Sequence, residues 1–402
     1  MRILFVNYEY PPLGGGGGVF THALATELAQ RHEVCVLTSA RGLRPSRGLE
    51  EGVEVVRAPI LVRRAQVVAS LPSLLAFVPI GILTGRRLLA RRKFDLVNTH
   101  FALPSGPVGR WIAARARVPH VLTLLGGDVY DPSKWLSPHR HAPLRSMVRS
   151  LVEAADATVV ASTDIGNRLR EHYRPRCHTQ RIPLATPTPP AAPLVAVSRR
   201  DLAIQDSTPL LVTVGRLIKR KDLGQMIRAL GRLVDLDPSL DVHLLIVGSG
   251  PERPRLERQA EGSGVADRIT FVGQVSEERK HQLLAAADVY VSTSRHEGFG
   301  LVFLEAMNAG LPVVCYADGG QGDFLIPEET GISVPTGDVE AFASACRRVL
   351  GDQDLRERMS RRARAAAAEL SIARCAARYE DLFRTLAESS SMVAPERMPL
   401  AR

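Results

Sequence analysis

The sequence predicts an α/β protein with two doubly wound domains, and three observations carry this prediction. A chain of 402 residues is too long for one compact core. Short apolar runs alternate with segments of helical spacing along most of its length, which is typical of parallel sheets covered by helices. A proline-rich stretch at 186–193 predicts an extended linker. We therefore expect domains at 1–190 and 194–370, then a helix at 371–388 and a flexible, polar tail at 389–402.

The composition favours a globular protein of a reducing compartment with anionic partners. The net charge is +10, and arginine carries nearly all of it because the chain has only five lysines. Such an excess favours phosphates or an acidic lipid surface. Five scattered cysteines without a C-x-x-C pair argue against zinc and disulfides, and no signal peptide precedes the first expected strand, so we expect a cytoplasmic protein. Aromatic residues make up only 5% and do not alternate with arginine, which argues against nucleic acid.

The first domain is expected to hold a complete doubly wound sheet, because apolar runs and helical segments alternate up to the linker. The expected strands are 3–6, 34–38, 53–57, 95–99, 120–125, 157–161 and 180–184, and the expected helices are 19–30, 108–116, 144–154 and 162–171.

A run of five glycines follows the first expected strand. Strand, glycine loop and helix together form a geometry that cradles phosphate, so Gly15, Gly16 and Gly17 are candidate phosphate contacts. The run does not match the dinucleotide fingerprint, because Val19 stands where its last glycine belongs and no acidic residue follows about twenty residues later. A flexible surface loop is the alternative interpretation.

Residues 65–85 carry no charge and are flanked by arginines on both sides. The length would fit a membrane-spanning helix, but prolines and glycines interrupt the stretch and a strand follows at once. Two alternatives remain open, namely a helix lying in an anionic membrane surface and an ordinary helix packed on the sheet.

Two polar side chains of the first domain lie where expected strands end. His100 follows the strand at 95–99, and Asp128 follows the strand at 120–125. Open α/β sheets bind ligands at the carboxyl ends of their strands, so both residues are candidates for a catalytic site. A structural role in the core is the alternative for His100.

The second domain is expected to repeat the alternation. The expected strands are 210–214, 242–247, 269–272, 288–292, 313–315 and 332–334, and the expected helices are 223–233, 255–261, 278–286, 301–309, 341–350 and 355–369.

The segment 294–305 carries the clearest chemistry of the chain. A strand, a tight glycine turn and a helix start follow one another there, and a helix start offers unpaired N–H groups to phosphate. Glu297 and Glu305 bracket this start and would repel phosphate, so we expect them to accept hydrogen bonds from hydroxyls instead. Phosphate flanked by hydroxyls describes a nucleotide-sugar. A surface helix with solvated glutamates is the alternative.

Two motifs resemble those of the retaining glycosyltransferases of family 4. Glu297 and Glu305, seven residues apart around Gly298-Phe299-Gly300, resemble the family's E-x7-E motif, and Gly215-Arg216 with Lys221 resembles its G-R-L-x-x-x-K element. The resemblance implies the GT-B architecture, in which two Rossmann-like domains face each other across a cleft. It also implies that the first domain binds the acceptor, the second binds the donor, and the helix at 371–388 returns to the first.

The resemblance assigns a role to each matching residue. Arg216 and Lys221 would hold the diphosphate, Glu305 would bind the ribose diol, and Glu297 would contact the sugar. The remaining donor contacts would come from backbone groups on turns, namely Gly215, Gly248, Gly250, Phe299, Gly300 and Leu301, with the first domain's glycines closing on the diphosphate.

One position departs from the family pattern. Many members carry a histidine where this chain has Leu125, and a leucine cannot bond a sugar hydroxyl. Either Asp128 or His100 supplies that contact, or the acceptor subsite differs.

The resemblance implies transfer from a nucleotide-sugar to a glycan, glycolipid or lipid-linked hydroxyl, as in polysaccharide biosynthesis, on the inner face of the plasma membrane. We expect neither a cofactor nor a metal, because fixed cations can balance the leaving diphosphate and the two D-x-D sequences, 235–237 and 352–354, are interpreted as helix-end residues. A GT-B-fold nucleotide-sugar epimerase and a basic membrane-surface protein with a degenerate pocket are the alternatives.

Overall fold

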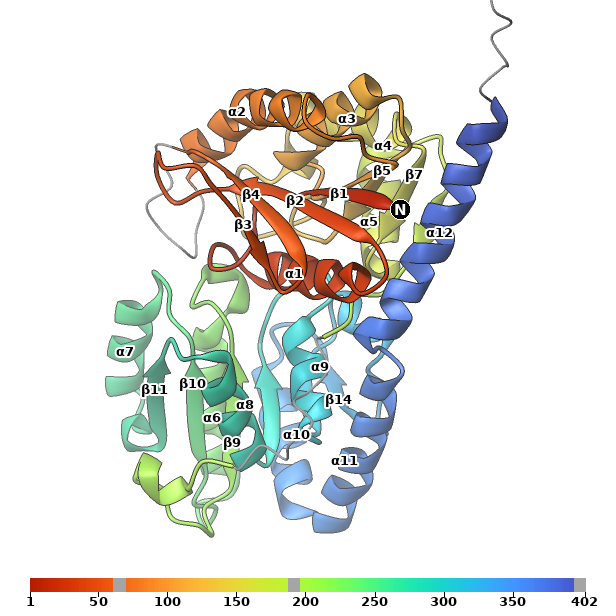
Figure 1. Cartoon of the computed structure of the whole chain (residues 1–402). Coiled ribbons are helices and arrows are strands. Elements are labelled where there is room, and N and C mark those ends of the chain that lie inside the picture. Colours follow the sequence, from red (N-terminus) through yellow and green to blue (C-terminus); the bar gives the residue numbers. More distant parts are fainter. Residues whose placement is uncertain (61–69, 187–195, 394–402) are drawn as a thin grey trace, which may run out of the picture. The chain divides into compact units, whose positions relative to one another are not determined.

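The computed structural model describes residues 1–60, 70–186 and 196–393 and divides the chain into two compact units. The first unit contains residues 1–130, 136–184 and everything from 372 onward, and the second contains 131–135 and 185–371. Both units are α/β, as predicted (Figure 1). The long C-terminal helix α12 therefore belongs to the first unit.

The first unit contains one eight-stranded sheet within the described residues, in the order β3-β4-β2-β1-β5-β6-β7-β8. All neighbours pair in parallel except β3 and β4. The direction of winding reverses between β1 and β5. The strands are β1 Arg2–Val6, β2 Glu33–Ser39, β3 Ser46–Glu50, β4 Val53–Ala58, β5 Leu96–His100, β6 His120–Leu124, β7 Ala157–Val160 and β8 Thr179–Arg181.

Strand β3 was not predicted. Its sequence carries a single apolar side chain, Leu49, which is exposed, so no period of two marks the strand. A two-residue turn joins it to β4, and both turn residues, Glu51 and Gly52, have positive φ angles of 47° and 81°. This turn matches the twist of an antiparallel hairpin.

The helices of the first unit cover both faces of its sheet. Helices α2 and α3 lie along one face and α1 along the other, where α12 packs beside it (Figure 1). Glu380 of α12 accepts hydrogen bonds from Arg31 and His32 at 2.8 Å each. The helices are α1 Gly16–Ala29, α2 Leu71–Leu89, α3 Ser105–Ala116, α4 Ala142–Glu153, α5 Thr163–Tyr173 and α12 Ile372–Val393.

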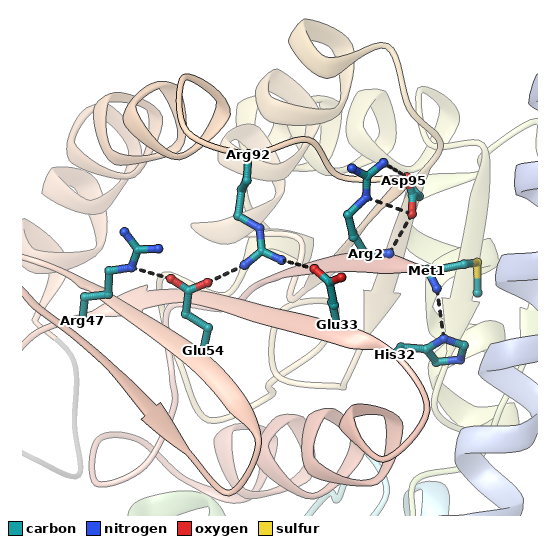
Figure 2. A network of polar contacts seen from close by, with 8 residues as sticks. All are labelled: Met1, Arg2, His32, Glu33, Arg47, Glu54, Arg92 and Asp95. Atoms are coloured by element: carbon teal, nitrogen blue, oxygen red, sulfur yellow. Dashed lines mark hydrogen bonds and ion pairs between the residues drawn. The ribbon is translucent and has the colours of Figure 1, made fainter.

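Arginines bind the amino ends of the first sheet together in a chain of ion pairs (Figure 2). Arg92 bridges Glu54 and Glu33, with 3.2 Å to the latter, and Glu54 also pairs with Arg47. Arg2 pairs with Asp95 at the start of β5 (2.5 Å). Part of the arginine excess is therefore structural and does not form an open basic patch.

The second unit contains a six-stranded, all-parallel sheet within the described residues, in the order β11-β10-β9-β12-β13-β14. Winding reverses between β9 and β12. Its strands are β9 Leu210–Val214, β10 His243–Val247, β11 Ile269–Gly273, β12 Val289–Ser292, β13 Val313–Tyr316 and β14 Gly331–Val334. Its helices are α6 Leu223–Leu236, α7 Arg253–Glu261, α8 Glu277–Ala286, α9 Leu301–Asn308, α10 Val339–Gly351 and α11 Gln353–Ala368.

The two D-x-D sequences lie at helix ends, as interpreted from the sequence. Asp352 caps α11 by accepting a hydrogen bond from Leu355 N (2.8 Å). Asp237 follows α6 and accepts hydrogen bonds from the backbone and hydroxyl of Ser239.

Candidate active site

The predicted donor-site residues meet at the carboxyl edge of the second sheet, where winding reverses between β9 and β12. The segment after β9 and the segment after β12 are hydrogen-bonded to each other: Arg295 N donates to Arg220 O (2.9 Å), and Thr293 Oγ1 donates to Asp222 O (3.1 Å). The two sequence motifs, about eighty residues apart in the chain, therefore form one local structure.

The buried Glu297 forms an ion pair with the partly buried Lys221 at this edge. Lys221 Nζ lies 2.5 Å from Glu297 Oε1, and Arg220 lies 3.9 Å from the same carboxylate. Burial would raise the pKa of Glu297, but Lys221 and Arg220 together hold that pKa at about 2. Glu297 is therefore ionised throughout the physiological range.

The backbone of Glu297 is anchored as firmly as its side chain. Gly320 N donates to Glu297 O (2.7 Å), and a β-bridge joins Glu297 to Gly319. A Cβ atom on Gly319 would lie 2.4 Å from Glu297 O, so only glycine permits this approach.

Helix α9 begins at Leu301, shortly after the anchored Glu297. Its N-cap, Gly300, has a φ of 91° and carries no side chain that could cap the helix. The N–H groups at the start of a helix have no intrahelical acceptor, so the turn from Phe299 to Leu301 offers donors to a ligand. Phe299 itself is 2% exposed and packs on Phe324, which fixes the turn.

Glu305 lies in the second turn of α9 and pairs with a lysine that the sequence reasoning did not single out. Lys280 Nζ of α8 lies 2.9 Å from Glu305 Oε2, and both residues are buried. Burial raises the pKa of Glu305, and Lys280 opposes that rise. The only available signal for Lys280 was its rarity as one of five lysines.

The glycines of the other two turns permit close backbone contact between loops. A Cβ on Gly248 would lie 1.9 Å from Gly215 O, and one on Gly250 would lie 2.3 Å from Leu217 O. Leu217 N donates to Ser249 O (2.9 Å) across the same contact. These glycines thus hold the turn that carries Arg216, whether or not they also touch a ligand.

The glycine run of the first unit forms a helix start. Helix α1 begins at Gly16, three residues earlier than predicted, with Gly15 as an N-cap that has no side-chain hydrogen bond. A Cβ on Gly17 would lie 2.3 Å from the ring of Phe101, so a side chain there has no room. The flexible-loop alternative is wrong, and phosphate binding by this run stays a prediction.

His100 does not fit the catalytic role that was predicted from its position. The side chain is completely buried, its Nδ1 lies 2.7 Å from Thr21 Oγ1, and Phe5 and Phe20 pack on the ring. Burial lowers the pKa of His100 to about 3, so the ring is neutral. His100 therefore fits the alternative interpretation, a structural role in the core of the first unit, and its catalytic role stays a prediction.

Asp128 likewise organises its own loop. One carboxylate oxygen accepts hydrogen bonds from Leu125 N and Gly126 N, and the other accepts one from Ala102 N (2.8 Å). With 6% of its surface exposed, the carboxylate is committed to joining the turns after β5 and β6. Asp128 thus has a structural role in the first unit, and its catalytic role stays a prediction.

Comparisons with known proteins show the family of the chain. Residues 196–366 match the profile "Glycosyl transferases group 1", and residues 15–185 match "Glycosyl transferase 4-like domain". The D-inositol 3-phosphate glycosyltransferase of Corynebacterium glutamicum is 30% identical over 95% of this chain and 96% of its own. The glycogen synthase of Mycobacterium tuberculosis is 31% identical over 90% of this chain and 89% of its own.

The chain belongs to glycosyltransferase family 4. Solved structures agree on the GT-B fold of this glycosyltransferase. Sucrose-phosphate synthase from Thermosynechococcus elongatus matches with a TM-score of 0.82 and 25% identity over 97% of this chain and 100% of that one. The complex of Anabaena HepE with UDP-glucose matches with a TM-score of 0.73 and 21% identity over 96% of this chain and 100% of that one.

Leu125 stands where many members of family 4 carry a histidine. The side chain is 7% exposed, and its Cδ1 would lie 3.2 Å from a Cβ on Gly17. Both residues that were named as replacements for the histidine make hydrogen bonds inside the first unit, His100 to Thr21 and Asp128 to backbone N–H groups. These contacts favour the third alternative, a different acceptor subsite, which stays a prediction.

Proposed function

We propose that this glycosyltransferase transfers a sugar from a nucleoside-diphosphate sugar to an acceptor hydroxyl with retention of anomeric configuration. The observation that carries the proposal is the ion pair between Lys221 and the buried Glu297, close to the start of α9. A cation, a carboxylate and a helix start at one edge of the sheet suit a diphosphate next to a sugar. The UDP-glucose bound in the HepE structure supports a donor of this class.

The chemical steps follow from the charges of the site. Breaking the bond between the sugar and the diphosphate adds one negative charge to the departing diphosphate, and the Lys221 ammonium and the Arg216 guanidinium stabilise this charge as it develops. The acceptor oxygen forms the new bond to the sugar, and its proton passes to an oxygen of the departing diphosphate. Glu297 holds Lys221 in place before the donor arrives and keeps an acceptor oxygen for a sugar hydroxyl. Because Glu297 is paired with Lys221, it is poorly placed to act as a nucleophile, which supports attack by the acceptor on the face that the diphosphate leaves.

A donor screen tests this proposal. Purified enzyme is incubated with UDP-, ADP-, GDP- and dTDP-sugars, and release of nucleoside diphosphate is measured with and without candidate acceptors. We expect one donor to be cleaved, and NMR of the product to show the donor's own anomeric configuration. An inverted product would contradict retention, and failure of every donor would contradict the proposal as a whole.

We further propose that the reaction needs no bound metal, because fixed cations occupy the position where charge develops. Activity in an excess of EDTA, roughly 5–10 mM, should remain within about twofold of the activity of the untreated enzyme. Strict dependence on added Mn²⁺ or Mg²⁺ would contradict this. An epimerase would instead interconvert the donor sugar without an acceptor, and product analysis in that condition separates the two reactions.

The acceptor is proposed to be a glycan, glycolipid or lipid-linked hydroxyl at the cytoplasmic surface of a membrane, and α2 provides the specific observation. The helix packs on α3, where a Cβ on Gly85 would lie 2.5 Å from Ile112. The opposite side exposes Leu71, Leu75 and Leu83 by 48%, 65% and 48%. The helix is thus packed on the unit and also presents an apolar stripe.

Charge indicates an anionic lipid surface for this stripe. Arg86, Arg87, Arg91 and Lys93 are exposed at and after the end of α2, and no acidic residue occurs between 59 and 94. By length and composition alone α2 would also fit a membrane crossing, but 28% of it is buried in the first unit. Residues 65–69, which begin the predicted segment 65–85, lie outside the described structure.

Flotation with liposomes tests this surface. Wild type should float with vesicles of phosphatidylglycerol and phosphatidylcholine, less so in high salt, and Leu75→Ser with Arg86→Gln and Arg87→Gln should reduce binding about tenfold or more. A matched control replaces exposed arginines elsewhere, Arg361→Gln and Arg362→Gln of α11. Equal flotation of both variants would contradict the proposal.

A further inference from the structure

Among the cationic side chains that pair with Glu297 or Glu305, that of Lys280 is the most deeply buried. It extends from α8, the helix that precedes β12, whereas Glu305 extends from α9, the helix that follows β12. Lys280 is 8% exposed and Glu305 is 7% exposed. The Lys280 ammonium lies 2.9 Å from Glu305 Oε2 and 2.6 Å from Glu277 Oε2, so it joins a buried and an exposed carboxylate.

A carboxylate in this position requires a nearby cation. Removing an ionised carboxyl from water is costly, and without a counter-charge such a group takes up a proton instead. The ionised form accepts strong, charge-assisted hydrogen bonds from both hydroxyls of a vicinal diol, whereas the neutral acid carries an O–H donor on one oxygen and is a weaker acceptor. The charge on Glu305 is therefore the property that a diol-binding role needs.

We propose that Lys280 is a positioning residue, which keeps Glu305 ionised and correctly oriented to bind the ribose diol of the nucleoside diphosphate. The inference rests on the proposed function, because it takes Glu305 as the ribose contact. Lys280 itself touches carboxylates on two helices and needs no contact with the donor.

The charged groups around Glu305 leave no other cation for this task among the described residues. Two charged residues of α8 face the Glu305 carboxylate. One is Lys280, and the other is Glu277, whose negative charge raises the pKa of Glu305 further. Tyr290 of β12 is buried beside it as a neutral phenol. Arg364 of α11 meets α9 only at its far end, at Ala309 O (3.0 Å).

The test measures ribose preference, which is the ratio of the affinities for a nucleoside diphosphate and for its dideoxy counterpart, and does not depend on activity. UDP, ADP and GDP are each titrated against their 2′,3′-dideoxy counterparts by calorimetry, with wild type, Lys280→Met, Lys280→Arg and Glu277→Gln. Wild type should prefer the ribose form of whichever diphosphate binds, by on the order of 10- to 100-fold, the range for hydrogen bonds to a charged group. Lys280→Met should lose this preference at pH 7, whereas Lys280→Arg and Glu277→Gln should keep it.

The pH dependence separates loss of charge from loss of structure. In Lys280→Met the preference should return as pH rises and Glu305 ionises, whereas the wild-type preference should change little between pH 6 and 9. A structural role would predict no such recovery. An unchanged preference in Lys280→Met at pH 7 would overturn the inference.

A second variant keeps the test valid if Lys280→Met folds poorly. Replacing both partners, Lys280→Met with Glu305→Gln, leaves no lone buried charge. It should bind as Glu305→Gln alone does, because Lys280 acts through Glu305. A further loss of several fold in the double variant would overturn the inference. If no diphosphate binds wild type, the proposed function itself fails and the role of Lys280 falls with it.

Discussion

At the scale of single residues, two lysines of the second unit pair with two of its buried carboxylates. Lys221 pairs with Glu297 and Lys280 pairs with Glu305, in a chain where lysine is otherwise rare. A compact ammonium with three donors can serve a carboxylate and still reach a phosphate, which suits Lys221. The sequence indicated Lys221 through its motif but did not connect Lys280 with Glu305, because no spacing rule links neighbouring helices.

Replacing Lys221 tests the catalytic role of its charge. Lys221→Ala should lower the rate constant of transfer by about 100-fold or more, the loss typical for one group that stabilises developing charge. The neighbouring Lys219 is exposed, so Lys219→Ala is a matched control that should stay within about twofold. Steady-state kinetics with the donor found in the screen measures both, and equal rates would contradict the assignment.

The same pair predicts a dependence of stability on pH. The pKa of Glu297 is held at about 2, below the 4.5 of a free glutamate, so the pair stabilises the fold fully above pH 4.5. This stabilisation, about 3 kcal/mol for a shift of that size, should be lost as pH falls from about 4.5 towards 2. Urea unfolding of Glu297→Gln should show a deficit at pH 7 that shrinks at pH 3; a deficit independent of pH would contradict the pairing.

At the scale of elements, the predictions succeeded where apolar periodicity is strong and failed where it is weak. The buried strands and most helices of both units lie within a few residues of their predicted ranges. Strand β3 has no such pattern. The start of α1 was predicted too late because its first three residues are glycines, which carry no helical signal. His100 and Asp128 lie at strand ends, as predicted, but both are buried, which the sequence did not indicate because it does not show which way a side chain points.

The space around two helical glycines, one in each unit, predicts opposite effects on stability when each is replaced by alanine. On α3, a Cβ on Gly109 would lie 1.7 Å from Thr99 Oγ1 of β5, so Gly109→Ala should destabilise the protein by about 1–3 kcal/mol. On α6, Gly231 has open space around it, so Gly231→Ala should stabilise by about 0.5–1 kcal/mol. Chemical denaturation measures both, and a stabilised Gly109→Ala variant would contradict the packing.

At the scale of the whole molecule, the chain leaves the first unit and returns to it. The predicted linker at 186–193 lies near the boundary after residue 184, and α12 belongs to the first unit. The short excursion of 131–135 into the second unit was not predicted, because nothing in its composition marks a boundary. The return of α12 is secured by Tyr379, which is fully buried and whose hydroxyl lies 3.4 Å from Thr123 Oγ1.

Removing this anchor should weaken the first unit. Tyr379→Ala should lower the unfolding free energy by about 3–5 kcal/mol, as expected for truncating a large buried aromatic side chain. Arg378 is its exposed neighbour on α12, and Arg378→Ala should stay within about 0.5 kcal/mol. Thermal and urea unfolding of both variants provide the comparison; similar stabilities would contradict the anchoring role of Tyr379.

The position of α12 also has a consequence for biosynthesis. The ribosome makes residues 1–184 first, yet the helix that covers part of their surface is among the last segments to emerge. The surface of the first unit that binds Tyr379 and Phe383 therefore stays exposed while the entire second unit is translated. We expect the growing polypeptide to be most prone to aggregation, and most dependent on chaperones, during that interval.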